Sequence, residues 1–132
     1  MKALRSRAIT LGFLADVAGS WIAGIAVFAF TPGLEGLSVE QQSAVLSVSP
    51  FVFLLGSLMT YLGGFVAGHL APGEELANSF AVGALVTLLT FFSLLDSSAG
   101  TPFWLVAVAM LITIPLAVAG GLSRASLRRK TA

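Results

Sequence analysis

Charge is scarce in this chain, and cysteine is absent. Only 10% of the 132 residues are charged, against about 25% in an average soluble domain. The absence of cysteine excludes disulfides, thiolate metal ligands and cysteine nucleophiles. The single histidine, His69, cannot supply a conventional zinc site alone. With a hydrophobic content of 57%, this composition is typical of a membrane protein.

Most of the hydrophobic residues lie in four long stretches: 8–30, 51–70, 76–95 and 103–122. Each is long enough to cross a hydrocarbon core of about 30 Å as an α-helix. The connections are short, so neighbouring helices should run antiparallel. We therefore expect an all-α polytopic membrane protein, with four transmembrane helices in an antiparallel bundle that forms a single membrane domain over residues 1–132. Ser38 and Gln41 match a capping box, which predicts a short outer helix over 39–47.

Basic residues are confined to the two ends of the chain. All seven lie before the first hydrophobic stretch or at and after the end of the last one. By the positive-inside rule, both termini should be cytoplasmic, and an even number of spans requires the same. We expect a bacterial inner-membrane location. The basic tail either sets this topology or also contacts anionic lipid headgroups.

Small residues recur at every fourth position of each stretch and define one face of each helix. In lipid, helices associate through close backbone approach at small residues, while bulky side chains can face the acyl chains. We therefore expect the small faces to point inward. The helix-packing candidates are Gly12, Ser20, Gly24, Gly56, Gly64, Gly68, Gly83 and Gly121.

Asp16 is the only formal charge inside a hydrophobic stretch. An unpaired ionised carboxylate at mid-membrane costs roughly 2.5 to 3.5 kcal/mol on insertion scales. Counting from the helix ends, threonines of the other three stretches should lie at a similar depth. The candidate buried polar or proton site comprises Asp16, Thr60, Tyr61, Thr87 and Thr113. Either Asp16 is a protonated carboxyl that fixes helix register by bonding to a threonine, or it is a proton or cation site on a transport path.

The sequence gives little support to an enzyme. An aspartyl-protease dyad needs two carboxylates, whereas only Asp16 lies within a span. No Gly-x-Ser-x-Gly motif is present. His69 is interpreted either as a polar residue at a helix end or as an entry group for protons. We expect no metal, no cofactor and no nucleic-acid partner.

Two resemblances bear on these alternatives. Leu14 to Ser20 resembles the first helix of small multidrug resistance transporters, although that family carries Glu where this chain has Asp16. The resemblance implies that Asp16 would exchange protons for cations. More of the chain is similar to uncharacterised small four-helix bacterial membrane proteins. That similarity rests on Gly12 with Asp16, on the Gly-Gly-x-x-Ala of 63–67, and on Pro115 followed by Gly120 and Gly121.

Two functions follow as hypotheses. The first is a non-enzymatic accessory or structural subunit of a membrane complex, or a homo-oligomer, with the lipid bilayer and other membrane subunits or itself as partners. The alternative is a small proton-coupled transporter with Asp16 as coupling carboxylate and Thr60, Tyr61 and Thr113 lining the site.

Overall fold

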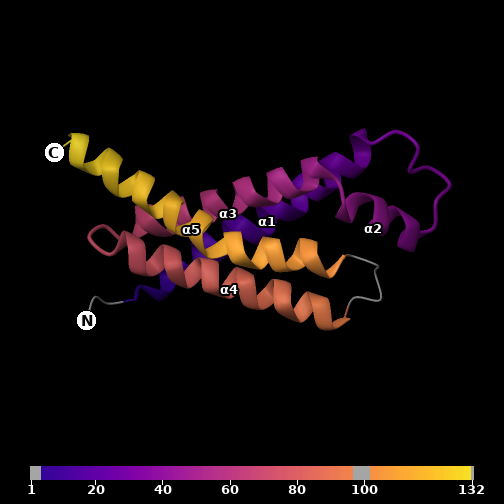
Figure 1. Ribbon diagram of the computed structural model, residues 1–132. Coiled ribbons are helices and arrows are strands. Elements are labelled where there is room, and N and C mark those ends of the chain that lie inside the picture. The colour runs from indigo at the N-terminus through magenta and orange to yellow at the C-terminus, as the bar shows by residue number, and fades with distance from the viewer. Residues whose placement is uncertain (1–3, 97–101, 132) are drawn as a thin grey trace.

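The computed structural model describes residues 4–96 and 102–131, which are helical apart from short connections (Figure 1). The helices are α1 (Ser6–Phe30), α2 (Val39–Ser47), α3 (Pro50–Leu70), α4 (Glu75–Asp96) and α5 (Phe103–Thr131). No strand occurs in this part of the chain. By length and composition, α1, α3, α4 and α5 could each cross a membrane. The all-helical fold with four candidate spans is therefore confirmed.

The last helix is longer than the apolar span predicted within it. The last hydrophobic stretch ends at Leu122, but α5 continues to Thr131. The additional residues include Arg128, Arg129 and Lys130 in the last turn. Arginine and lysine are good helix formers, and positive charge at a helix C-terminus complements the helix dipole. Hydropathy marks where a segment stops being apolar, which is not where the helix stops.

The short helix α2 forms as the capping box predicts. The Ser38 hydroxyl accepts from the backbone N–H of Gln41 at 3.3 Å, and the Gln41 side chain accepts from the backbone N–H of Ser38 at 3.0 Å. The Gln42 amide donates to the carbonyls of Leu34 and Leu37, each at 3.1 Å. These bonds fold the α1–α2 connection back onto α2.

The long helices form a bundle with two distinct ends (Figure 1). Both chain termini and the α3–α4 turn lie at one end, here called the terminal end. The end of α1, the start of α3 and helix α2 lie at the other, here called the far end. Helix α1 packs mainly on α3, α3 on α5, and α5 on α4. In Figure 1 the α1–α3 pair and the α4–α5 pair diverge toward the far end.

The bundle buries small residues and exposes large ones. Ala67 and Ala117 are fully buried, whereas Trp21 is 72% and Ile22 69% exposed. Bulky residues on the outside would be costly in water, but lipid tails are as apolar as the side chains themselves. The expectation that bulky residues face outward is confirmed by this burial.

Glycines bring the helices into backbone contact in the terminal half of the bundle. A Cβ added at Gly12 of α1 would lie 2.7 Å from the carbonyl oxygen of Gly63 on α3. One added at Gly68 of α3 would lie 3.0 Å from Cα of Gly121 on α5. Such close approach is possible only because these residues lack a side chain. Similar backbone contacts join three further pairs of helix positions: Gly64 with Ala117, Gly83 with Ile114, and Gly120 with Tyr61.

The far half of the bundle lacks these contacts. Beyond its own stretch of helix, a Cβ added at Gly24 or Gly56 would meet no described atom within 4 Å, although both were expected to pack helices together. Pro115 lies inside α5, where it removes one helical N–H donor. Figure 1 shows α5 changing direction between its orange and yellow halves. The divergence of the helices leaves space between them.

Candidate functional site

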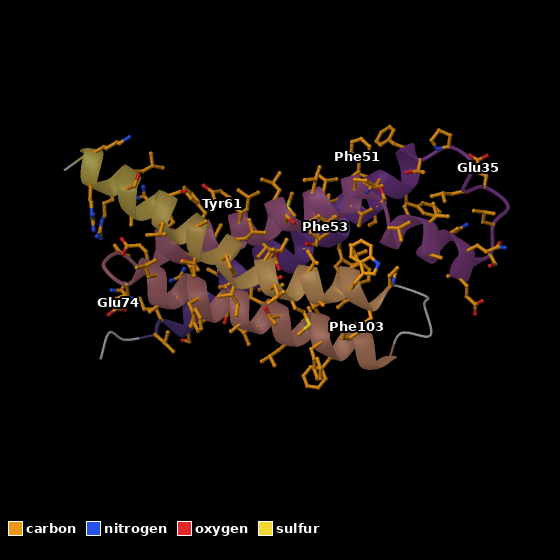
Figure 2. The ribbon with its side chains drawn as sticks, viewed as in Figure 1. Glu35, Phe51, Phe53, Tyr61, Glu74 and Phe103 are labelled. Atoms are coloured by element: carbon orange, nitrogen blue, oxygen red, sulfur yellow. The ribbon has the colours of Figure 1, made fainter. Side chains whose placement is uncertain are left out.

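The space between the diverging helices is a cavity of about 240 Å³. All four long helices line it, so it belongs to the bundle as a whole. The polar lining residues are Asp16, Ser20, Ser57, Thr60, Thr90 and Thr113, and the others are Val52, Phe53, Gly56, Val86, Ala109, Ile112 and Leu116. Figure 2 shows Phe53 lying between α3 and α5, whereas Phe51 points away from the bundle.

The cavity extends from Asp16 toward the far end. On α3, Thr60 is the lining residue nearest the terminal end, and the others reach outward as far as Val52. On α1, Ser20 lies one turn beyond Asp16 in the far direction. Toward the terminal end, the contact of Gly12 with Gly63 closes the bundle directly below Asp16. Asp16 therefore lies at the terminal-end limit of the cavity, next to the contact of Gly12 with Gly63.

Asp16 itself is buried, with 3% of its surface exposed. Thr60 provides a side-chain hydrogen bond to its carboxyl group. Oδ1 of Asp16 has no hydrogen-bond partner among the described residues. Thr113 also lines the cavity, but its hydroxyl donates to the Ala109 carbonyl of its own helix at 2.6 Å. A buried polar atom left unpaired is costly, and it marks a position where a ligand or proton would be stabilising.

Two of the candidate residues do not line the cavity. Thr87 is part-buried, and its hydroxyl donates to the Gly83 carbonyl at 2.8 Å. Helix α4 instead contributes Val86 and Thr90, which lie on one face because they are four residues apart. Tyr61 follows Thr60 and therefore points about 100° away from it around the helix. In Figure 2, Tyr61 lies on the side of the bundle opposite α4.

The terminal end carries a polar cluster that the sequence interpretation missed. Nη2 of Arg128 on α5 lies 3.1 Å from Oε1 of Glu75, which begins α4. Nε of Arg5 lies 3.7 Å from Oε2 of Glu74. Asn78 is fully buried, and it accepts from the Arg5 backbone N–H at 2.8 Å and donates to the Glu74 carbonyl at 2.9 Å. The sequence does place acidic and basic residues at the same end of the predicted bundle. It does not indicate which acidic residue pairs with which basic residue.

A second buried bond lies between this cluster and the cavity. The Ser79 hydroxyl of α4 donates to the Gly64 carbonyl of α3 at 2.7 Å, and Ser79 is fully buried. Ser79 also contacts Gly121 of α5, since a Cβ at that glycine would meet it. This residue therefore joins three helices in the closed half of the bundle.

The donor set limits the chemistry of the cavity. Among the described residues, no group of three or more His, Cys, Asp and Glu side chains could hold a metal ion. His69 is exposed in the last turn of α3 and does not line the cavity. One carboxyl group among hydroxyls can hold a proton or a single small cation. Comparisons with known protein families, with curated proteins and with solved structures find no match to this chain.

Proposed function

We propose that this protein is a small proton-coupled transporter in which Asp16 is the coupling carboxylate. The observation that carries the proposal is the unpaired Oδ1 of Asp16, which is buried at the base of a cavity formed by all four long helices. Intramembrane carboxylates of this kind serve as proton relays and ion sites. Because one carboxylate takes either a proton or another cation, it would exchange one for the other.

A purely structural role for Asp16 fits the contacts less well. A residue that only fixes helix register should have its polar atoms satisfied within the bundle. Of the three threonines expected as partners, Thr60 bonds to Asp16, while the hydroxyl protons of Thr87 and Thr113 are used within their own helices. Oδ1 has no partner among the described residues, and Asp16 lines the cavity, from which a proton or cation would reach it.

The direction of access follows from the charge distribution. The terminal end carries every basic residue that the structure describes, which favours a cytoplasmic location for it. In that orientation the cavity lies on the extracytoplasmic side of Asp16, and the glycine contacts lie between Asp16 and the cytoplasm. The protein would then be an inner-membrane transporter in an outward-open conformation.

The alternative role as an accessory subunit or homo-oligomer has weaker support. It assumed that small-residue faces are free for contacts with other subunits. In the terminal half these faces are used within the chain, as in the contacts of Gly12, Gly64 and Gly68. Gly56 lines the cavity instead. Of these five glycines, Gly24 alone stays free for a contact outside the bundle.

Proton release from vesicles tests the proposal. The purified protein is reconstituted into liposomes with an acidic lumen and a trapped pH-sensitive dye, and sodium, potassium or tetramethylammonium chloride is added outside. We expect at least one of these cations to drive proton release with the wild type, and Asp16→Glu to retain part of it. Asp16→Asn should abolish it while eluting as a folded protein on size exclusion. Equal release by wild type and Asp16→Asn, or no release with any of the three salts, would overturn the proposal.

A further inference from the structure

The polar side chains that line the cavity beside Asp16 carry oxygen alone. One carboxyl group and five hydroxyl groups contribute, from Asp16, Ser20, Ser57, Thr60, Thr90 and Thr113. Among the described residues that line this cavity, none has a nitrogen or sulfur atom in its side chain. The side chains therefore offer negative charge and oxygen lone pairs but no positive charge, which favours a cation over an anion as the ligand.

Two of the five hydroxyl groups have no proton left to donate. Thr90 of α4 donates its proton to the Val86 carbonyl at 2.9 Å, and Thr113 of α5 donates its proton to the Ala109 carbonyl at 2.6 Å. A hydroxyl group has one proton and two lone pairs, so each of these oxygens can act toward a ligand only as an acceptor. An acceptor of this kind can bind a cation but cannot bind an anion.

The other three hydroxyl groups belong to α1 and α3, close to the carboxyl group along each helix. Ser20 follows Asp16 by four residues on α1, so the two lie on one helix face. Ser57 precedes Thr60 by three residues on α3, and these two also share a face. Thr60 bonds to the Asp16 carboxyl group. Each of the four long helices thus contributes at least one oxygen to the same cavity.

The charge of the cavity lining sets the charge of its ligand. Asp16 is the only ionisable side chain among the described lining residues, and it is buried. One proton or one monovalent cation neutralises a single carboxylate, whereas a divalent cation would leave a net positive charge within the hydrocarbon core, which is costly. Oδ1 of Asp16 has no hydrogen-bond partner in the described part of the chain. A monovalent cation therefore matches both the charge and the unpaired oxygen.

Monovalent cations are either alkali-metal ions or organic ammonium ions, and the lining favours the first class. Oxygen ligands suit hard metal cations, which accept lone pairs from several directions. A quaternary ammonium ion has no N–H donor and is typically bound by a cage of aromatic faces. Phe53 is the one aromatic side chain among the described residues that line the cavity. The volume of about 240 Å³ also holds water molecules of about 30 Å³ each, which would complete the coordination of a metal ion.

We infer that the cargo of this cavity is an alkali-metal cation, bound by Oδ1 of Asp16 and by hydroxyl oxygens of the four long helices. This inference rests on the proposed function and names the cation that the protein exchanges for a proton. When the metal ion binds, the carboxyl O–H bond of Asp16 breaks and its proton passes to water, so the site is neutral in both states. The hydroxyl oxygens stabilise the metal ion, whereas the proton needs only the carboxylate.

Isothermal titration calorimetry in detergent measures cation binding without vesicles or a proton gradient. The purified protein is titrated with lithium, sodium, potassium or tetramethylammonium chloride, with N-methylglucamine chloride keeping the ionic strength constant. We expect saturable binding of at least one alkali cation and no binding of tetramethylammonium. The affinity for the alkali cation should weaken as the pH is lowered, because protons compete for the same carboxylate, and binding should be lost in Asp16→Asn.

Thr90 and Thr87 provide a matched pair that tests the hydroxyl ligands. Both lie on α4 and donate to a carbonyl of their own helix, at 2.9 and 2.8 Å, but of the two only Thr90 lines the cavity. Thr90→Val should weaken alkali-cation binding about tenfold, which corresponds to about 1.4 kcal/mol. Thr90→Ser keeps the oxygen and should bind nearly as the wild type does, and Thr87→Val should leave the affinity unchanged.

Three results would overturn this inference: no binding of any alkali cation, binding of tetramethylammonium in their place, or equal affinities of Thr90→Val and Thr87→Val. These results differ from failure of the transporter proposal. If tetramethylammonium alone drives proton release from vesicles, the protein is a transporter and the alkali-cation site is wrong. If an alkali cation binds but no salt drives proton release, the site stands and the transporter proposal is wrong.

Discussion

Gly64→Ala tests the closed half of the bundle most simply. A Cβ at this position would lie 2.6 Å from the carbonyl carbon and 2.7 Å from Cα of Ala117, and it would also collide with the carbonyl oxygen. All three atoms are backbone, so no side chain can move out of the way. Helices α3 and α5 must therefore separate by roughly 1 Å to reach ordinary carbon–carbon contact at about 3.5 to 4.0 Å.

The expected cost combines three terms. Overpacking of a close contact costs about 1 to 3 kcal/mol. Weakening the Ser79–Gly64 hydrogen bond adds about 0.6 kcal/mol, the average for a bond between membrane helices. Replacing glycine with alanine inside a helix stabilises the helix by about 0.5 to 1 kcal/mol, which offsets part of this cost. We therefore expect a net loss of about 1 to 3 kcal/mol in the free energy of unfolding.

Gly24→Ala is the matched control for this substitution. It makes the same chemical change in a helix, but the added Cβ would meet no described atom within 4 Å beyond its own stretch of helix. Helix propensity alone should then leave stability unchanged or raise it by up to about 1 kcal/mol. Equilibrium unfolding in mixed micelles with increasing sodium dodecyl sulfate measures both variants. If Gly64→Ala is as stable as Gly24→Ala, the backbone contact between α3 and α5 is wrong.

Two further predictions concern the cavity. Gly56→Leu should fill the cavity and abolish proton release without loss of folding, because a Cβ at Gly56 meets open space. Proton release and the size-exclusion profile are measured together, and unchanged proton release would contradict this prediction. Thr60→Val should reduce proton release several-fold by removing the hydrogen bond to Asp16. Thr87→Val should have little effect on proton release, because Thr87 does not line the cavity. Equal effects of the two substitutions would contradict this prediction.

The helices were predictable because their signals are local. Hydrophobic length locates the four candidate spans, and the capping box of Ser38 and Gln41 locates α2. The end of α5 lies beyond the predicted span because the basic residues that follow Leu122 stop the hydropathy signal without stopping the helix. The physical reason is that helix propensity and hydrophobicity are independent properties of arginine and lysine.

The site was only partly predictable because it depends on how each helix is rotated. The position of Asp16 in the first apolar stretch drew attention to it, and Thr60 shares its depth. On α4 the rows that contain Thr87 and Thr90 both look suitable, and only packing against α5 selects Val86 and Thr90. Similarly, Gly24 and Gly64 have equivalent sequence settings, although only Gly64 contacts another helix backbone.

One measurement tests the one-sided access to Asp16 most directly. Ser57→Cys places a thiol in the cavity. Ser79→Cys places one at a fully buried position in the terminal half of the bundle. Each variant is treated with a membrane-impermeant charged methanethiosulfonate in right-side-out and in inverted vesicles. We expect Ser57→Cys to react in right-side-out vesicles only, and Ser79→Cys to react in neither at a comparable rate. Reaction of Ser57→Cys from both sides, or from neither, would contradict a cavity that leads to Asp16 from the far end alone.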